Sequence, residues 1–151
     1  ELADTPIHRK RLVEIYRQFR PSLVLAHDAR DYHADHRAAS ALAESATWMV
    51  ASNGHRTSNA PLAAPPALWW IDTVMMQEFE PGFYIDVSPY MELKKRMLAC
   101  HKSQLRRKDE KGFGSLEAVL VQQCTTRGAQ AGVAAAEAFR SHPAWKRARA
   151  W

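Results

Sequence analysis

The sequence predicts an α/β layered fold. Helical and extended patterns alternate along the chain in the order helix, strand, helix, strand, strand, helix, helix. The 151 residues are 46% hydrophobic, which is enough for one ordinary domain with a core of its own. Strong strand patterns are few for a free-standing sheet, so we expect the amino-terminal strands of this sheet to be missing from the chain.

The first part of the chain carries a helix, a strand and a second helix. Residues 4–20 begin with an Asp/Thr cap and a proline, and their apolar side chains recur at helical spacing until Arg20-Pro21. The apolar run over 22–28 is typical of a buried strand. Helical spacing returns over 34–52, so the second helix begins soon after the strand ends.

A long loop, two strands and two helices are predicted next. The loop is rich in turn-forming residues, and Ser88-Pro89 and Ser115 are typical of helix starts. In chain order the elements are a loop over 53–66, strands over 67–74 and 83–88, and helices over 88–105 and 115–127. The tail is ambiguous, because its alanines favour a helix that Gly128 and Gly132 would interrupt.

The charge and hydropathy patterns argue against two kinds of partner. The net charge is +5, but the densest basic cluster, over 102–111, is interrupted by acids. Nucleic-acid-binding proteins usually concentrate Lys and Arg on one face, so we predict no nucleic-acid partner; an anionic small substrate is compatible with the charge. No apolar run approaches the roughly 18 residues that a membrane-spanning helix needs.

The cysteines indicate a reducing compartment. Cys100 and Cys124 are isolated, and neither belongs to a CxxC pair, which excludes a zinc knuckle. Such cysteines fit buried apolar roles, so a cytoplasmic location is predicted.

Residues 31–37, DYHADHR, raise the question of a metal site. His33 and His36 lie three residues apart, with Asp35 between them, at the carboxyl end of a predicted strand. In open α/β sheets this is the usual place for a ligand site. A single histidine at a helix start is most often a cap or turn residue. Two histidines on one helical face, with a carboxylate able to orient one of them, also fit a metal site.

Three stretches resemble one family of enzymes. VLAHDARDYHADHR (24–37) is similar to the second motif of the zinc-dependent de-N-acetylases of the PIG-L/LmbE-like family, which typically reads H-P-D-H; Ala34 stands in the proline position. Residues 83–104 resemble the family stretch in which D-[IV]-[ST] leads into a helix that ends in H-x-S-Q. AEAF (136–139) resembles the closing A-E-x-F. The matches follow the family's order and cover most of the chain.

The resemblance implies a Rossmann-like α/β hydrolase with one catalytic zinc ion (Zn2+). Such an enzyme removes the acetyl group from an N-acetylated amino sugar or a related amide. His36 matches a zinc ligand of the family motif. His33 would lie beside the metal and stabilise the charge that builds on the carbonyl oxygen, and Asp35 would take part in catalysis by orienting a histidine. Zinc suits this reaction because it polarises the carbonyl and lowers the pKa of bound water towards 7.

Substrate contacts are expected from Arg37, directly after the motif, and from His101. The resemblance implies that His101 borders the site by hydrogen bonding; by pattern alone, His101 is a histidine near a helix carboxyl end that the helix dipole stabilises. The loop over 53–66 is either a gate for the substrate or an ordinary connection. His27 and Asp28 either touch the site or cap the end of their strand.

Half of the expected site has no match in this chain. A catalytic zinc takes three protein ligands and a water molecule. The family draws the other two ligands and the general base from an amino-terminal H-P-D-D-E type motif. The histidines that lack such a context are His8, His27, His55 and His142. We therefore expect 1–151 to be a single domain, the carboxyl-terminal two-thirds of a de-N-acetylase, completed by upstream sequence or by a separate amino-terminal chain.

Two functions are compatible with these observations. The first is hydrolysis of an N-acetylated amino sugar, and the alternative is a catalytically inactive binding or interaction module with the same fold. An H-x-D-D motif upstream would favour the enzyme. If the remaining ligands lay within this chain, the first candidates would be Asp28, Asp31 and His101.

Overall fold

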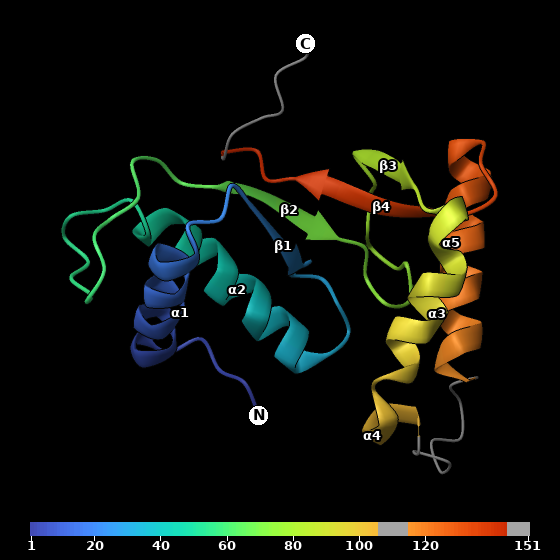
Figure 1. Cartoon of the computed structure of the whole chain (residues 1–151), viewed down its shortest axis with the longest axis horizontal. Coiled ribbons are helices and arrows are strands. Elements are labelled where there is room, and N and C mark those ends of the chain that lie inside the picture. The colour runs from blue at the N-terminus through green and yellow to red at the C-terminus, as the bar shows by residue number, and fades with distance from the viewer. Residues whose placement is uncertain (106–114, 145–151) are drawn as a thin grey trace. The chain divides into compact units, whose positions relative to one another are not determined.

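The computed structural model describes residues 1–105 and 115–144 (Figure 1). These residues form a mixed α/β fold with a four-stranded sheet, which confirms the predicted fold class. The chain divides into two compact units. One consists of Glu1–Gly82 together with the chain from Phe139 onwards, and the other of Phe83–Ala138.

The first unit contains the helices and strands that the sequence predicts there. They are α1 (Pro6–Phe19), β1 (Leu23–His27), α2 (Ala34–Met49) and β2 (Ala67–Ile71). β1 and β2 pair in parallel, so that His27 lies opposite Ile71. α1 packs on α2, and α2 packs on β1 (Figure 1). The Thr5 hydroxyl accepts a hydrogen bond from the His8 N–H group, and Pro6 opens α1, as the cap pattern predicts.

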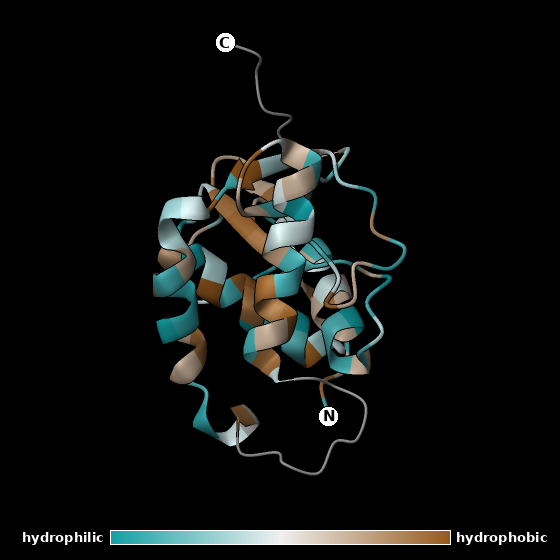
Figure 2. Ribbon diagram, turned by 90° about the vertical axis from the view of Figure 1, so that its right-hand side faces the viewer, coloured by the Kyte–Doolittle hydropathy of each residue, from teal (hydrophilic) through white to brown (hydrophobic). Residues whose placement is uncertain are grey.

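The core of the first unit lies between its helices and its strands. Figure 2 shows that the helices carry both hydrophobic and hydrophilic residues, as expected for helices with one buried side. The buried apolar residues include Val13, Val24, Ala26, Leu42, Ala43, Ala46, Leu68 and Trp70. Burial alternates along β1, where Leu25 is 55% exposed between two buried neighbours. An apolar pocket of about 380 Å³ lies beside Leu25 and is also lined by Ile15 and Leu42.

The tail of the chain, whose sequence pattern is ambiguous, forms a strand. α5 (Leu116–Ala131) runs through Gly128 and ends at Gly132, whose φ of 74° is the left-handed conformation that glycine adopts easily. A side chain at Gly128 would lie 2.7 Å from the Cα atom of Ala135, so this helix position requires glycine. β4 (Ala136–Ser141) follows, and its alanines are buried. Burial in the sheet therefore decides against the helix that the alanines favour.

The sheet combines parallel and antiparallel pairs. β3 (Phe83–Asp86) completes it, and the strand order is β1-β2-β4-β3. β4 pairs antiparallel with β2, with Ile71 opposite Phe139. Among the described strands, β1 therefore has a neighbour on one side only.

The second unit is built around two longer helices. After β3 come a 3₁₀ turn, η1 (Ser88–Tyr90), then α3 (Met91–Ala99), α4 (Lys102–Leu105) and α5. The single helix predicted over 88–105 is wrong in detail, because the chain leaves the helix at Cys100 and His101. The core of the second unit consists of Val87, Cys124 and Ala135, with Met91 and Leu120 packed against them.

The structure bears on two expectations from composition only within the residues that it describes. Most of the basic cluster over 102–111 lies outside the described residues. None of the described helices combines the length and the hydrophobicity that crossing a membrane requires.

Candidate metal centre

Three potential metal ligands meet where β1 ends and α2 begins. His27 is the last residue of β1, Asp31 lies in the following loop, and His36 lies in the first turn of α2. Their ligand atoms all lie within 4.8 Å of one another. Imidazole nitrogens and a carboxylate oxygen are donors that zinc accepts, so the chemistry of this set fits that metal. The described part of the chain therefore holds a candidate metal site at the end of a parallel strand.

Asp31 organises the loop that carries this site. Its Oδ1 atom accepts a hydrogen bond from the His33 N–H group at 2.9 Å and lies 3.0 Å from His36 Nδ1. Its Oδ2 atom accepts a hydrogen bond from the Val74 N–H group at 3.1 Å. Burial alone raises the pKa of Asp31, but these N–H groups and His36 outweigh it and hold the pKa below its ordinary value. The carboxylate is therefore charged and almost fully buried.

The histidine rings stack on one another. The ring centroids of His27 and His36 are 3.9 Å apart, with 7° between the planes, and those of His33 and His36 are 4.7 Å apart. Burial, followed by the neighbouring His36, lowers the pKa of His27. His27 therefore favours its neutral form more than a free histidine does. The sequence left its role undecided, and its position at the end of a parallel strand was the available signal.

His33 and Asp35 are linked through the backbone. His33 is the N-cap of α2, and its Nδ1 atom accepts a hydrogen bond from the Asp35 N–H group at 3.2 Å. The Asp35 carboxylate accepts a hydrogen bond from the Leu2 N–H group at 2.9 Å. The carboxylate that contacts a histidine ring at hydrogen-bond distance is that of Asp31, rather than that of Asp35.

The two predicted substrate contacts lie in different units. Arg37 is exposed, and its Nη1 atom donates hydrogen bonds to the backbone oxygens of Asp31 at 2.9 Å and Tyr32 at 2.6 Å, so it braces the loop. His101 is exposed between α3 and α4 in the second unit. Contact of either residue with a substrate stays a prediction.

Asp28 is a second buried carboxylate at the end of β1, but it serves a different purpose. Its Oδ1 atom accepts hydrogen bonds from Arg30 N–H at 2.9 Å and Arg30 Nε at 3.1 Å, and its Oδ2 atom pairs with Arg140. Burial alone raises the pKa of Asp28, but the two guanidinium groups hold it below its ordinary value. Among the candidates that the sequence offers for the remaining ligands, Asp31 joins the cluster, whereas the charge of Asp28 is neutralised by arginines.

Solved structures of other proteins superpose on most of this chain. The N,N'-diacetylchitobiose deacetylase from Pyrococcus horikoshii matches with a TM-score of 0.79 and 26% identity, over 95% of this chain and 54% of that one. The chain shares its fold with known enzymes. The conserved protein TT1542 from Thermus thermophilus has a TM-score of 0.77 and 28% identity, over 97% of this chain and 66% of that one. GalB, the 4-carboxy-2-hydroxymuconate hydratase from Pseudomonas putida, shows likeness of fold, with a TM-score of 0.70 and 22% identity over 97% and 64%.

A comparison by sequence gives a related result. The 4-oxalmesaconate hydratase of Pseudomonas putida is 28% identical over 96 residues, which is 62% of this chain and 37% of that protein. No protein-family model matches the chain. The chain thus spans less than two thirds of the length of the curated relative and of the first solved structures. A deacetylase and a hydratase with the same fold support an enzymatic function in general.

Proposed function

We propose that the chain is the carboxyl-terminal two-thirds of a zinc-dependent N-deacetylase of the PIG-L/LmbE-like family. The substrate class is an N-acetylated amino sugar or its conjugate. The observation that carries the proposal is the cluster of His27, Asp31 and His36 at the end of β1. The 26% identity to a chitobiose deacetylase supports it.

Each residue of the motif has a task in this reaction. His36 would hold the zinc ion, which would supply the polarisation of the acetyl carbonyl and the activation of water. His33 is oriented by the Asp35 N–H group, so its Nε2 atom can donate a hydrogen bond to the carbonyl oxygen as charge builds there. A donor in that position is worth about 2–4 kcal/mol. A substrate contact of Arg37, and separately one of His101, stays a prediction.

The remaining ligands and the general base come from sequence upstream or from a separate amino-terminal chain. This chain spans 54% of the deacetylase chain, so that protein has further residues without a counterpart here. A general base must take a proton from water and deliver it to the leaving amine. In the described residues near the motif, the carboxylates of Asp28 and Asp31 are already paired, so neither is suited to that task.

Acetate release is the test of the proposed reaction. The intact protein, with any residues that precede Glu1, should release acetate from N-acetylglucosamine conjugates in a zinc-dependent manner. His36→Ala should abolish the activity, whereas His55→Ala, at an exposed histidine of the 53–66 loop, should retain it. Full activity of His36→Ala would refute the assignment of His36 as a ligand.

Hydration of a carbon–carbon double bond is the second candidate reaction. The observation that favours it is the 28% identity to 4-oxalmesaconate hydratase over 96 residues. A carboxylate-bearing substrate would agree with the net charge of +5. Loss of the ultraviolet absorbance of an unsaturated dicarboxylate, without acetate release from N-acetylated sugars, would favour this reaction over deacetylation.

A further inference from the structure

We infer that Asp31 selects the nitrogen atom through which His36 binds metal, which makes Asp31 a positioning residue. The inference rests on the proposed function, in which His36 is a zinc ligand. It extends that function to a residue outside the H-x-x-H motif, five positions before His36.

The contact between Asp31 and His36 defines where the imidazole proton lies. An ionised carboxylate accepts hydrogen bonds and donates none. Because Asp31 Oδ1 lies 3.0 Å from His36 Nδ1, that nitrogen must carry the proton. The lone pair of the neutral ring is then on Nε2, which becomes the nitrogen available to a metal ion.

Asp31 acts through His36 rather than as a ligand itself. Its Oδ1 atom already serves His33 N–H and His36, and its Oδ2 atom serves Val74 N–H. The side chain is 1% exposed. A move towards a metal ion would leave these N–H groups without their partner in a buried place, which costs about 1–3 kcal/mol for each group.

The same contacts fix the position of the His36 ring. The Val74 N–H group ties Asp31 to the segment after β2, and Arg37 donates to the Asp31 backbone oxygen. The His27 ring stacks on His36 at 3.9 Å. The ring is therefore held at its edge by a carboxylate and on its face by another ring, so that little freedom is lost when a metal binds.

Asp35 does not show the corresponding geometry. Its carboxylate accepts a hydrogen bond from the Leu2 N–H group and is not within hydrogen-bond distance of a histidine ring. It reaches His33 through its backbone N–H group, a contact that any residue except proline can supply. Replacing the Asp35 side chain should therefore disturb His36 less than replacing Asp31.

Zinc affinity of the intact protein tests the inference. Asp31→Asn should lower the affinity about 10–100-fold, the usual effect of removing the partner of a metal-binding histidine. Asp35→Asn should lower it less. Asp28→Asn is the matched control, because it also removes a buried charge at the end of β1 but one that pairs with Arg30 and Arg140. It should leave the zinc affinity of the folded protein unchanged.

The proton position can also be read without any substitution. Two-bond ¹⁵N–¹H correlations of the zinc-free protein should show His36 protonated at Nδ1 when the ring is neutral. Protonation at Nε2 instead would overturn the inference, even if Asp31→Asn failed to fold.

The outcomes separate this inference from the proposed function. Equal zinc affinity of the wild-type protein and Asp31→Asn would overturn the inference and leave the deacetylase proposal standing. A wild-type protein that binds no zinc would overturn both. The expected loss of affinity in a protein that does not hydrolyse N-acetyl groups would support the role of Asp31 and contradict the proposed reaction.

Discussion

His33 uses its two ring nitrogens for different tasks. Nδ1 accepts the Asp35 N–H group and caps α2, which leaves Nε2 to meet a substrate. We expect His33→Ala to lower turnover about 100–1000-fold with zinc content retained, because an oxyanion donor acts mainly in the transition state. His33→Asn is the control for the cap: asparagine caps helices well, so stability should be kept while activity is still lost. Zinc stoichiometry, melting temperature and turnover of both variants test this role. Loss of zinc in step with activity would show that His33 is a zinc ligand.

Asp28 should make stability depend on pH in the acid range. Its pKa is held below the ordinary value of 3.8 by Arg30 and Arg140, against the effect of burial. The stabilisation is therefore complete above pH 3.8 and is lost as the pH falls through the lowered pKa. The unfolding free energies of wild type and Asp28→Asn should differ most near neutral pH and converge at low pH. Urea titrations at several pH values measure this; a difference that does not change with pH would contradict it.

At the scale of elements, α1 holds the end of α2 through one buried arginine. Arg17 of α1 is 3% exposed. Its guanidinium group donates hydrogen bonds to the backbone oxygens of Met49, Val50, Ser52 and Asn59 and to the Thr57 hydroxyl. Some of these carbonyls belong to the carboxyl end of a helix, where a positive charge is also favourable.

Removing this guanidinium group should destabilise the first unit. Arg17→Met leaves buried carbonyl groups without donors, so we expect a loss of roughly 2–4 kcal/mol in the free energy of unfolding. Arg11→Met changes an exposed arginine on the same helix and should cost no more than about 0.5 kcal/mol. Urea unfolding of both variants measures the difference, and equal losses would show that the contacts of Arg17 contribute little.

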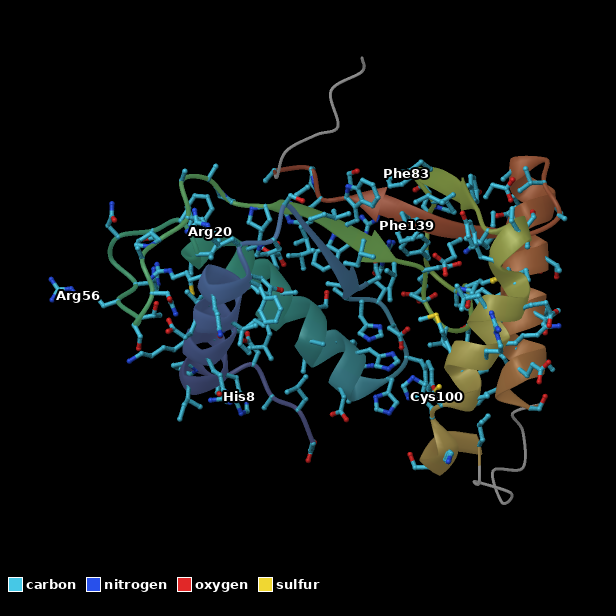
Figure 3. All side chains as sticks on the ribbon, viewed as in Figure 1. His8, Arg20, Arg56, Phe83, Cys100 and Phe139 are labelled. Atoms are coloured by element: carbon cyan, nitrogen blue, oxygen red, sulfur yellow. The ribbon has the colours of Figure 1, made fainter. Side chains whose placement is uncertain are left out.

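The same contacts bear on the loop over 53–66. Thr57 and Asn59 are tied to α1 by Arg17 and Glu14, while Arg56 extends away from the ribbon (Figure 3). Whether the loop gates a substrate stays a prediction. Its anchored part, at least, is a connection with defined contacts.

The elements that the sequence predicts best are those with local signals. α1 and α2 have apolar side chains at helical spacing, and α1 has a cap and a proline at its start. β4 has no such signal, because its alanines fit a helix in isolation and become a strand only through burial beside β2. The break in the helix at Cys100 and His101 likewise contains no glycine or proline that would predict it.

The candidate site was predictable in part for the same reason. His33 and His36 share one turn and are visible as a spacing. His27 lies nine positions before His36, and Asp31 reaches both His36 and Val74, which is 43 positions away. Such contacts arise when a loop folds back between a strand and a helix, so they cannot be predicted from the spacing of residues in the sequence. The local pattern therefore points to Asp35, the carboxylate between the two histidines, as the partner of a histidine.

At the scale of the whole molecule, the chain of 151 residues should neither bind zinc tightly nor catalyse deacetylation by itself. His36 supplies one ligand and His27 at most a second, Asp31 is engaged as the partner of His36, and catalytic zinc sites use three protein ligands. Dialysis of the chain against dilute zinc, followed by measurement of bound metal and acetate release, tests this. One tightly held zinc ion per chain would show that the missing ligands lie within it, and His27 and Asp31 would be the first to replace.

The position of β1 at the end of the strand order has a consequence for concentrated solutions. Its outer backbone N–H and C=O groups have no partner strand among the described residues, and Leu25 is 55% exposed on it. A strand with these properties is a template on which another chain can add by edge-to-edge pairing. The chain should therefore self-associate as its concentration rises. Leu25→Lys should reduce light scattering at high concentration without lowering the melting temperature, since a charged side chain at an exposed edge position opposes such pairing.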